Sequence, residues 1–174
     1  MSGHNKWSQI KNQKGTTDKK RGQLFSKLLK AISIAAKTET NPQFNPRLRS
    51  AIEKAKENNV PQDNIERAIN KASEEKNLGD IIVEAYGPEG SAIIIEGITD
   101  NTNRSISEIK HILTKQGGKI ANPRSVLWSF EKKSGDWQAK FPQTISEPAK
   151  EKLNQLIEAL EEREDVQRII TNIN

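Results

Sequence analysis

The spacing of the apolar residues changes once along this chain, and that change limits the folds that the chain can adopt. Between residues 24 and 72, apolar side chains recur at steps of three and four, the period of an amphipathic helix. From Asp80 onward, short apolar runs are separated by turn residues, which is typical of strands. The two patterns meet in the polar segment 73–79, which we interpret as a linker. The sequence therefore predicts a helical part followed by a part that contains a sheet.

Three helices are expected in the first part. The first would run from about residue 16 to residue 37, with four lysines largely outside its apolar stripe: Lys19, Lys20, Lys27 and Lys30. Asn45 and Pro46 signal a second start, because asparagine caps helix N-termini and proline is tolerated in the first turn. Pro61 would open a third helix that ends near residue 72. Short connections between three helices predict a small bundle.

The second part predicts strands that alternate with helices. Residues 80–86 and 91–99 would form a hairpin, and a helix after it would end at Gly117 and Gly118. A strand at 125–131 would place Val126, Trp128 and Phe130 on a common side, followed by a short strand at 137–141, a helix from about 147 and a strand at 166–171. From residue 91 the order strand, helix, strand, strand, helix, strand is that of a ferredoxin-like fold.

We therefore predict an α+β protein with two domains. Residues 1–76 would form a basic arm and a three-helix bundle, and residues 77–174 a ferredoxin-like αβ sandwich with an extra N-terminal strand. Because such a scaffold hosts many functions, the predicted fold alone does not indicate what the protein does.

Positive charge is concentrated at the start of the chain. Residues 1–40 hold nine basic residues against two acidic ones, a net charge of +7, whereas the whole chain carries +5. Residues 41–76 carry +1 and residues 77–174 carry −3. A local positive field of this kind attracts a polyanion through counterion release, a contribution that does not depend on base sequence. A lysine-rich tail that only improves solubility is the alternative.

The basic arm, residues 2–15, shows neither a helical nor a strand period. Within it, Trp7 lies between Lys6 and Lys11, so that its ring can stack on a base or sugar while the ammonium groups meet phosphates. Trp7 can also pack against the helices and anchor the arm, and the sequence leaves both roles open. The arm has too little apolar surface to offset its ordering entropy, so we expect it to be mobile without nucleic acid.

Catalysis finds little support in the sequence. The chain has no cysteine, which excludes disulfides, thiolate nucleophiles and cysteine-ligated zinc. Its two histidines, His4 and His111, belong to no pattern that supplies a nucleophile or a metal triad. The turns at 87–90 and 117–118 lack the spacing of a phosphate-binding loop. We therefore expect no enzyme activity, no catalytic residue, no cofactor and no bound metal.

A membrane location is not expected either. The longest apolar run, residues 92–95, is far too short to span a bilayer, and the N-terminus carries charges where a signal peptide needs an apolar region. These features predict a soluble cytoplasmic protein with no membrane partner, and we expect a monomer.

Several long segments of the chain resemble the YebC/PmpR family. They read SGHNKWSQIKNQK, FSKLLKAISIAAK, NPRLRSAIEKAKENNVPQDNIERAI, YGPEGSAIIIEGITDNTNRSISEIKHILTKQGGKI, SVLWSFEKK and LIEALEEREDVQRIITN. Relatives in that family include the mitochondrial translational activator of cytochrome c oxidase. The resemblance implies a cytosolic, non-enzymatic regulator of gene expression, described both as a DNA-binding transcriptional regulator and as a ribosome-associated translation factor.

The chain departs from that family at one place. Full-length members carry a further αβ lobe after the strand that matches SVLWSFEKK, where this chain has only SGDWQAKFPQTIS. We therefore expect a shortened member without the inserted third lobe. The basic arm and the helical segment are intact, so the resemblance carries nucleic-acid contacts over to Lys6, Trp7, Lys11, Lys14, Lys19, Lys20, Arg21, Arg47 and Arg49. His4, as a phosphate or RNA contact, and Lys27 complete the candidate set.

Three functional hypotheses follow from these observations. In the first, the arm and the bundle bind duplex DNA and regulate transcription. In the second, they bind ribosomal RNA or tRNA, and the protein assists translation at the ribosome. A third and weaker hypothesis is a protein-interaction module. No helix-turn-helix or RNA-recognition motif in the sequence decides between DNA and RNA.

Overall fold

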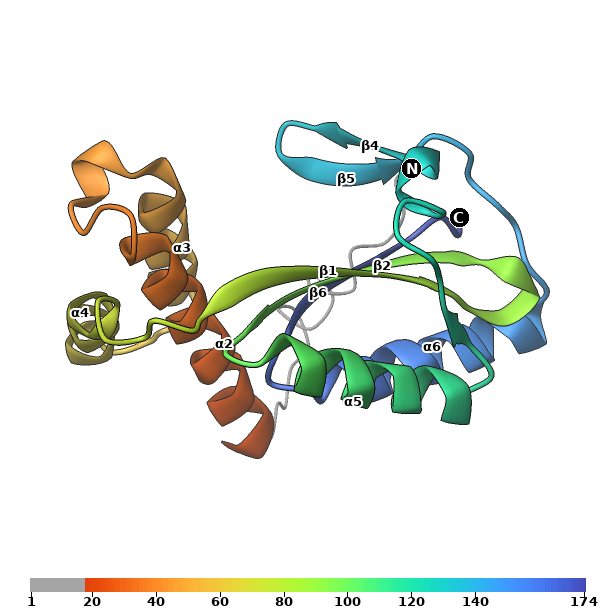
Figure 1. Cartoon of the computed structure of the whole chain (residues 1–174), viewed down its shortest axis with the longest axis horizontal. Helices are drawn as coiled ribbons and strands as arrows, with labels where there is room; N and C mark the ends of the chain where they lie inside the picture. Colours follow the sequence, from red (N-terminus) through yellow and green to blue (C-terminus); the bar gives the residue numbers. More distant parts are fainter. Residues whose placement is uncertain (1–17) are drawn as a thin grey trace. The chain divides into compact units, whose positions relative to one another are not determined.

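The computed structural model describes residues 18–174, which form two compact units. We call residues 18–80 with 98–101 the helical unit, and residues 81–97 with 102–174 the sheet unit. Figure 1 labels most of the helices and strands of both. A helical part that precedes an antiparallel sheet confirms the predicted α+β class. The expected arm, residues 2–15, lies outside the described residues.

Three α-helices make up most of the helical unit: α2 (Asp18–Ala36), α3 (Pro46–Glu57) and α4 (Gln62–Lys71). A short 3-10 helix, η1 (Pro42–Phe44), precedes α3. The apolar stripes predicted from the sequence meet in the core, where Leu28, Ile32, Leu48 and Ile65 are almost fully buried. The Ser33 hydroxyl donates a hydrogen bond to the carbonyl of Ala68 and so ties α2 to α4.

Asn45 joins the second helix to the first. Its side-chain oxygen accepts the Leu48 N–H at 3.0 Å, which is the predicted cap of α3. Its side-chain NH₂ donates to the carbonyls of Ala35 and Glu39, each at 2.7 Å. The residue is only 7% exposed, so these three bonds satisfy groups that water does not reach.

The expected linker is attached to the helical unit at its C-terminal end. Leu78 is buried and packs with Ile34 and Ile98. The Lys37 ammonium donates to the carbonyls of Lys76 and Leu78. Residues 73, 74, 76 and 77, by contrast, are exposed. The part of the segment open to proteolysis is therefore residues 73–77.

We expect limited proteolysis to cut first within residues 73–77. A glutamate-specific protease should cleave at Glu74 or Glu75 and leave a stable C-terminal fragment, as measured by mass spectrometry. Lys37→Ala should accelerate that cut, because it releases the end of the segment, whereas the exposed Lys110→Ala should not. A first cut between residues 91 and 131 would contradict the proposed boundary at 76/77.

The sheet unit is built on four strands in the order β3-β1-β2-β6. These strands are β1 (Gly79–Tyr86), β2 (Ala92–Thr99), β3 (Lys119–Ile120) and β6 (Val166–Thr171). Strand β1 pairs antiparallel with β3, with Ala85 opposite Ile120, and β2 pairs antiparallel with β6, with Ile94 opposite Ile170. Helices α5 (Thr102–Lys115) and α6 (Glu147–Glu161) lie along one face (Figure 1).

The opposite face is covered by a two-stranded hairpin, β4 (Phe130–Lys133) and β5 (Asp136–Ala139). Ile93 and Ile95 of β2 face the helices, together with Leu113 and Leu156. Ala92 and Ile94 face the other way, where they pack with Val126, Phe130 and Ile170. This burial on both faces explains why the β2 sequence is a continuous apolar run and does not alternate.

The strand predicted at 125–131 differs in the structure. Its middle is a 3-10 turn, η3 (Leu127–Ser129), and only its end belongs to β4. Val126 and Phe130 are buried as expected, but Trp128 is 62% exposed. The physical reason is the buried carboxylate of Glu84, which accepts the backbone N–H groups of Val126 and Leu127 that a strand would use for pairing.

The hairpin also changes which strands make up the main sheet. The segments predicted as strands at 125–131 and 137–141 pair with each other in β4 and β5 and form a separate two-stranded sheet. The place beside β1 is taken by β3, a two-residue strand that the sequence pattern does not reveal. No helix within residues 18–174 is long and apolar enough to cross a membrane.

Candidate nucleic-acid interface

Three of the candidate residues lie together at the first turn of α2. Lys19, Lys20 and Arg21 are all exposed there. Three adjacent exposed cations concentrate positive charge on this part of the helix surface, next to the single acid Asp18. A local positive field of this kind attracts polyanions.

Two further candidates lie at the start of α3 and already have partners. The Arg47 guanidinium binds both carboxylate oxygens of Asp80, at 3.0 and 2.7 Å. Arg49 donates to the carbonyl of Pro42 at 3.0 Å. Both arginines are exposed, and a surface ion pair such as Arg47–Asp80 contributes at most about 1 kcal/mol. A phosphate can therefore compete with Asp80 for Arg47 at small cost.

The two basic groups lie at opposite ends of α2. The side chain of Asn45, which caps α3, donates to the carbonyl of Ala35 near the end of α2, so the start of α3 lies at that end. Lys19 lies at the other end of α2. A rise of 1.5 Å per residue puts about 24 Å between residues 19 and 35. A single ligand that touches both groups must be extended, and on B-form DNA that distance corresponds to about seven base pairs.

Lys27 does not lie on the surface. Its exposed fraction is 5%, because it falls within the buried stretch of α2 and not outside the apolar stripe as the sequence pattern indicated. A contact between Lys27 and a large ligand would require a rearrangement of the side chain. The candidates His4, Lys6, Trp7, Lys11 and Lys14 lie outside the described residues.

Sequence reasoning missed three exposed aromatic residues. Within residues 18–174, exposed large hydrophobic side chains are Phe44, Ile82, Trp128 and Phe141. Phe44 stands in the polar stretch NPQFNP without a helical or strand period, a signal that could have indicated a surface position. The tertiary position of Trp128 had no such signal, because its alternation with Val126 and Phe130 predicted burial.

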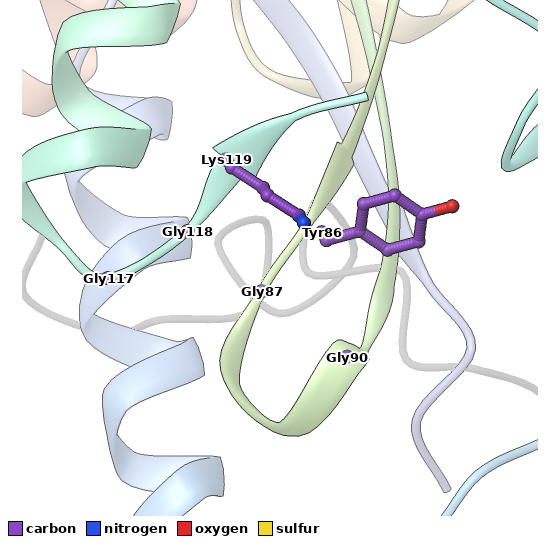
Figure 2. Close-up of a pocket in the computed structure, with 6 residues that line it drawn as sticks. All are labelled: Tyr86, Gly87, Gly90, Gly117, Gly118 and Lys119. Carbon is purple, nitrogen blue, oxygen red and sulfur yellow. The ribbon is translucent and has the colours of Figure 1, made fainter. Parts of the chain in front are cut away.

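The two glycine turns come together in the sheet unit. Figure 2 shows the pocket of about 380 Å³ that they line, with Tyr86, Gly87 and Gly90 on one side and Gly117, Gly118 and Lys119 on the other. The Lys119 ammonium lies 5.6 Å from the centre of the Tyr86 ring, a cation–π contact. Gly118 permits the close approach, because a Cβ there would lie 2.8 Å from the carbonyl oxygen of Tyr86.

A neighbouring anion position is occupied by the protein itself. The N-terminus of α6 is capped by Ser146, whose hydroxyl and backbone N–H both donate to the carboxylate of Glu89, at 2.6 and 3.1 Å. These two bonds lower the pKa of the Glu89 carboxyl below its usual value. The N-terminus of α6 beside the glycine turns is therefore already bonded to an exposed carboxylate of the protein itself. Within residues 18–174 no cluster of acidic and histidine side chains is arranged to hold a metal ion.

The architecture defines a two-unit α+β protein with a basic helix start, and comparison with known proteins places it in a family. Residues 5–75 match the family described as the TACO1/YebC protein N-terminal domain, and residues 78–135 match the TACO1/YebC second and third domain. The chain belongs to the TACO1/YebC family.

Individual relatives agree with this assignment. A probable transcriptional regulatory protein of Desulfosudis oleivorans is 51% identical over 137 residues, which is 76% of this chain and 56% of the relative. One from Finegoldia magna is 48% identical over 76% of this chain and 57% of its own length. A crystal structure of a conserved hypothetical protein from Aquifex aeolicus superimposes with a TM-score of 0.87 at 31% identity, over 97% of this chain and 96% of the other.

The matched part spans little more than half the length of these curated relatives. Their names support a regulatory role. The absence of an inserted third lobe, the domain boundary and the individual contact residues stay predictions.

Proposed function

We propose that this protein is a non-enzymatic, cytoplasmic regulator of gene expression that binds nucleic acid, with DNA as its target. The observation that carries the proposal is the density of cations at one end of the chain, with Lys19, Lys20 and Arg21 exposed at the start of α2. The relatives called probable transcriptional regulatory proteins support DNA as the target.

Binding of this kind acts mainly on the phosphate backbone. Lysine is a compact point charge that neutralises a phosphate but carries little base specificity. Each phosphate contact releases condensed counterions, so affinity falls as salt rises. The basic groups at the two ends of α2 would follow an extended backbone, with Lys19 at one end and Arg49 at the other. Sequence preference must come from other residues or from partner proteins.

A second candidate function, the ribosome-associated translation factor that binds ribosomal RNA or tRNA, is favoured by Phe44. This ring is 74% exposed and lies in η1, whose Pro42 carbonyl accepts a bond from Arg49. An exposed ring in the short helix that Arg49 binds suits an unpaired base, which can stack on the ring while the guanidinium meets a phosphate. Duplex DNA offers no such base. Phe44→Ala should then weaken binding to structured RNA and leave duplex DNA binding unchanged.

The proposal is tested by removing four lysines of the basic end together. We expect the quadruple alanine variant to bind DNA and RNA of any sequence more than about tenfold more weakly at near-physiological salt. The plot of log affinity against log salt should flatten by about 0.9 for each phosphate that the variant no longer neutralises on a duplex, and by about 0.7 on single strands. Fluorescence anisotropy measures both quantities. The variant combines substitutions at Lys11, Lys14, Lys19 and Lys20.

A matched variant controls for net charge. Alanine at four exposed lysines elsewhere removes the same four charges and should leave affinity and slope nearly unchanged; these are Lys54, Lys56, Lys110 and Lys115. If both variants weakened binding equally, the loss of affinity would come from the lower net charge of the protein and not from the four lysines of the basic end. If the first variant bound as tightly as the parent, the nucleic-acid proposal would have to be abandoned. Binding of a protein partner, with no nucleic acid, would favour the interaction-module hypothesis.

A further inference from the structure

Two exposed aromatic rings touch each other on the sheet unit. Trp128 and Phe141 are 62% and 59% exposed, and their ring centres lie 5.7 Å apart with the planes tilted by 49°. Large aromatic side chains normally bury most of their area, so two that remain in water side by side require an explanation. They account for two of the four exposed large hydrophobic side chains among residues 18–174.

A hydrogen bond to the backbone holds the Trp128 ring in place. Its indole N–H donates to the carbonyl of Ser125 at 2.7 Å, and the Tyr86 hydroxyl reaches the same carbonyl at 3.4 Å. Ser125 in turn belongs to the loop whose backbone is fixed by the buried Glu84 carboxylate. Fixed rings lose little conformational entropy when a ligand stacks on them, so this arrangement favours binding.

Phe141 is positioned by the strand pairing next to it. The backbone N–H of Lys140 donates to the carbonyl of Ser129 at 2.8 Å, which continues the β4–β5 pairing by one residue. Trp128 directly precedes Ser129 in the chain, and Phe141 directly follows Lys140. The aromatic pair is thus part of the hairpin framework and not of a loose loop.

The surroundings of the pair are basic. Residues 119–143 contain five basic and two acidic residues, a net charge of +3. Both acids are already paired, Glu131 with Lys133 and Asp136 with Arg168. Arg124, four positions before Trp128, and Lys140, directly before Phe141, are exposed, and neither side chain has an ion-pair partner within the described residues. The local excess of positive charge lies in a part of the chain that is acidic overall, since residues 77–174 carry −3.

We propose that Trp128 and Phe141 form a stacking platform for unpaired nucleotides, with Arg124 and Lys140 on the adjacent phosphates. The proposal rests on the nucleic-acid function above and deepens it, because it assigns a second contact surface and names single-stranded segments as its ligand. Stacking on aromatic rings tolerates any base, since every base has a π-face, and cations beside the rings bind the backbone. In a duplex the bases are already stacked on each other and have no free face for Trp128.

A protein ligand is less well suited to this surface. The exposed apolar surface that marks a protein-binding site is a contiguous patch of more than a few hundred Å². Here the exposed large apolar side chains are the two rings, and the apolar residues nearby in the sequence, Val126 and Phe130, are buried in the unit. The combination of stacked rings and excess positive charge therefore favours a flexible polyanion with aromatic bases.

The test compares a single strand with a duplex. Anisotropy at about 0.15 M salt would measure binding of a 15-nucleotide oligouridine and of a 15-base-pair duplex of mixed sequence. Trp128→Ala should weaken binding of the single strand by about 5- to 150-fold and leave the duplex nearly unchanged. Phe141→Ala should act in the same direction. Trp128→Phe, which keeps a ring that can stack, should retain most of the affinity.

Two controls separate stacking from general damage. Ile82→Ala removes another exposed apolar side chain of the sheet unit and should have no effect on either ligand. Because Trp128 is largely exposed, its alanine variant should unfold at nearly the same temperature as the parent, which circular dichroism measures. The double variant Arg124→Ala, Lys140→Ala should flatten the single-strand salt slope by about 1.4, which corresponds to two phosphate contacts.

Each outcome decides between the two proposals. If the parent binds the single strand and Trp128→Ala binds it equally well, the platform is overturned while the nucleic-acid function stands. If the parent binds neither ligand, both proposals fall. If Trp128→Ala leaves binding unchanged but turns a self-associated parent into a monomer in sedimentation, the pair is a contact between copies of this chain and the platform is overturned.

Discussion

Glu84→Ala is expected to lower the free energy of unfolding of the sheet unit by about 3 to 5 kcal/mol. The carboxylate is 7% exposed and accepts three backbone N–H groups: those of Arg124, Val126 and Leu127. Alanine would leave these donors without a partner, and each unsatisfied buried donor costs about 1 to 3 kcal/mol. Water can reach part of the loop, which keeps the expected total below the full sum. Denaturant unfolding measures the loss.

Glu84→Gln should be intermediate, at about 1 to 3 kcal/mol. Its amide oxygen can still accept from Val126 and Leu127, but its NH₂ group faces the N–H of Arg124, and two donors cannot bond each other. Glu131→Ala, which removes a partly exposed carboxylate of β4, should cost less than about 1 kcal/mol. Amide hydrogen exchange should become faster at residues 124–127 in both Glu84 variants. Unchanged exchange there would contradict the role assigned to this carboxylate.

Asn45→Ala is expected to destabilise the helical unit by about 2 to 4 kcal/mol. Loss of the α3 cap accounts for about 1 kcal/mol. The remainder comes from the carbonyls of Ala35 and Glu39, which would lose the donor that the buried side-chain NH₂ supplies. The variant removes a side chain that joins two helices, so the loss should appear in the helical signal of a denaturant titration.

The substitution Asn45→Asp separates the two contributions. Aspartate can accept the Leu48 N–H, but as an acceptor it faces the carbonyls of Ala35 and Glu39, and its charge would be buried. It should therefore be no more stable than the alanine variant. Asn41→Ala provides the matched control, because Asn41 caps the exposed η1 through one bond to Gln43 and should cost less than about 1 kcal/mol. Equal losses at residues 41 and 45 would show that the buried bonds contribute nothing.

Local signals account for the parts of the fold that the sequence predicts well. Asn45 and Pro46 mark the start of α3 correctly, because a cap bond is formed with a residue three positions away. Pro148 likewise lies in the first turn of α6, behind the cap Ser146. Helical periods read over ten or more residues place α4 and the end of α2 to within a few residues.

The region after residue 120 could not be predicted from local sequence patterns, because contacts with distant residues decide its structure. Alternating apolar residues predicted a strand with Trp128 inside, yet Glu84, some forty residues earlier, binds the backbone there and turns Trp128 outward. The two-residue strand β3 is too short to show an alternating hydrophobic pattern in the sequence. It forms because its backbone pairs with the edge of β1. The burial of Lys27 similarly depends on packing around α2 and not on its helical position alone.

The candidate site divides in the same way. The sequence by itself determined where along the chain positive charge is concentrated, because the positions of the charged residues in the sequence do not depend on the fold. It also determined the caps and the helical periods, which depend on residues three or four positions apart. The tertiary structure alone decided that Arg47 faces Asp80, that two glycine turns line one pocket, and that Trp128 meets Phe141. These contacts join residues between 13 and more than 30 positions apart, and such pairs form only when the whole chain buries its apolar surface.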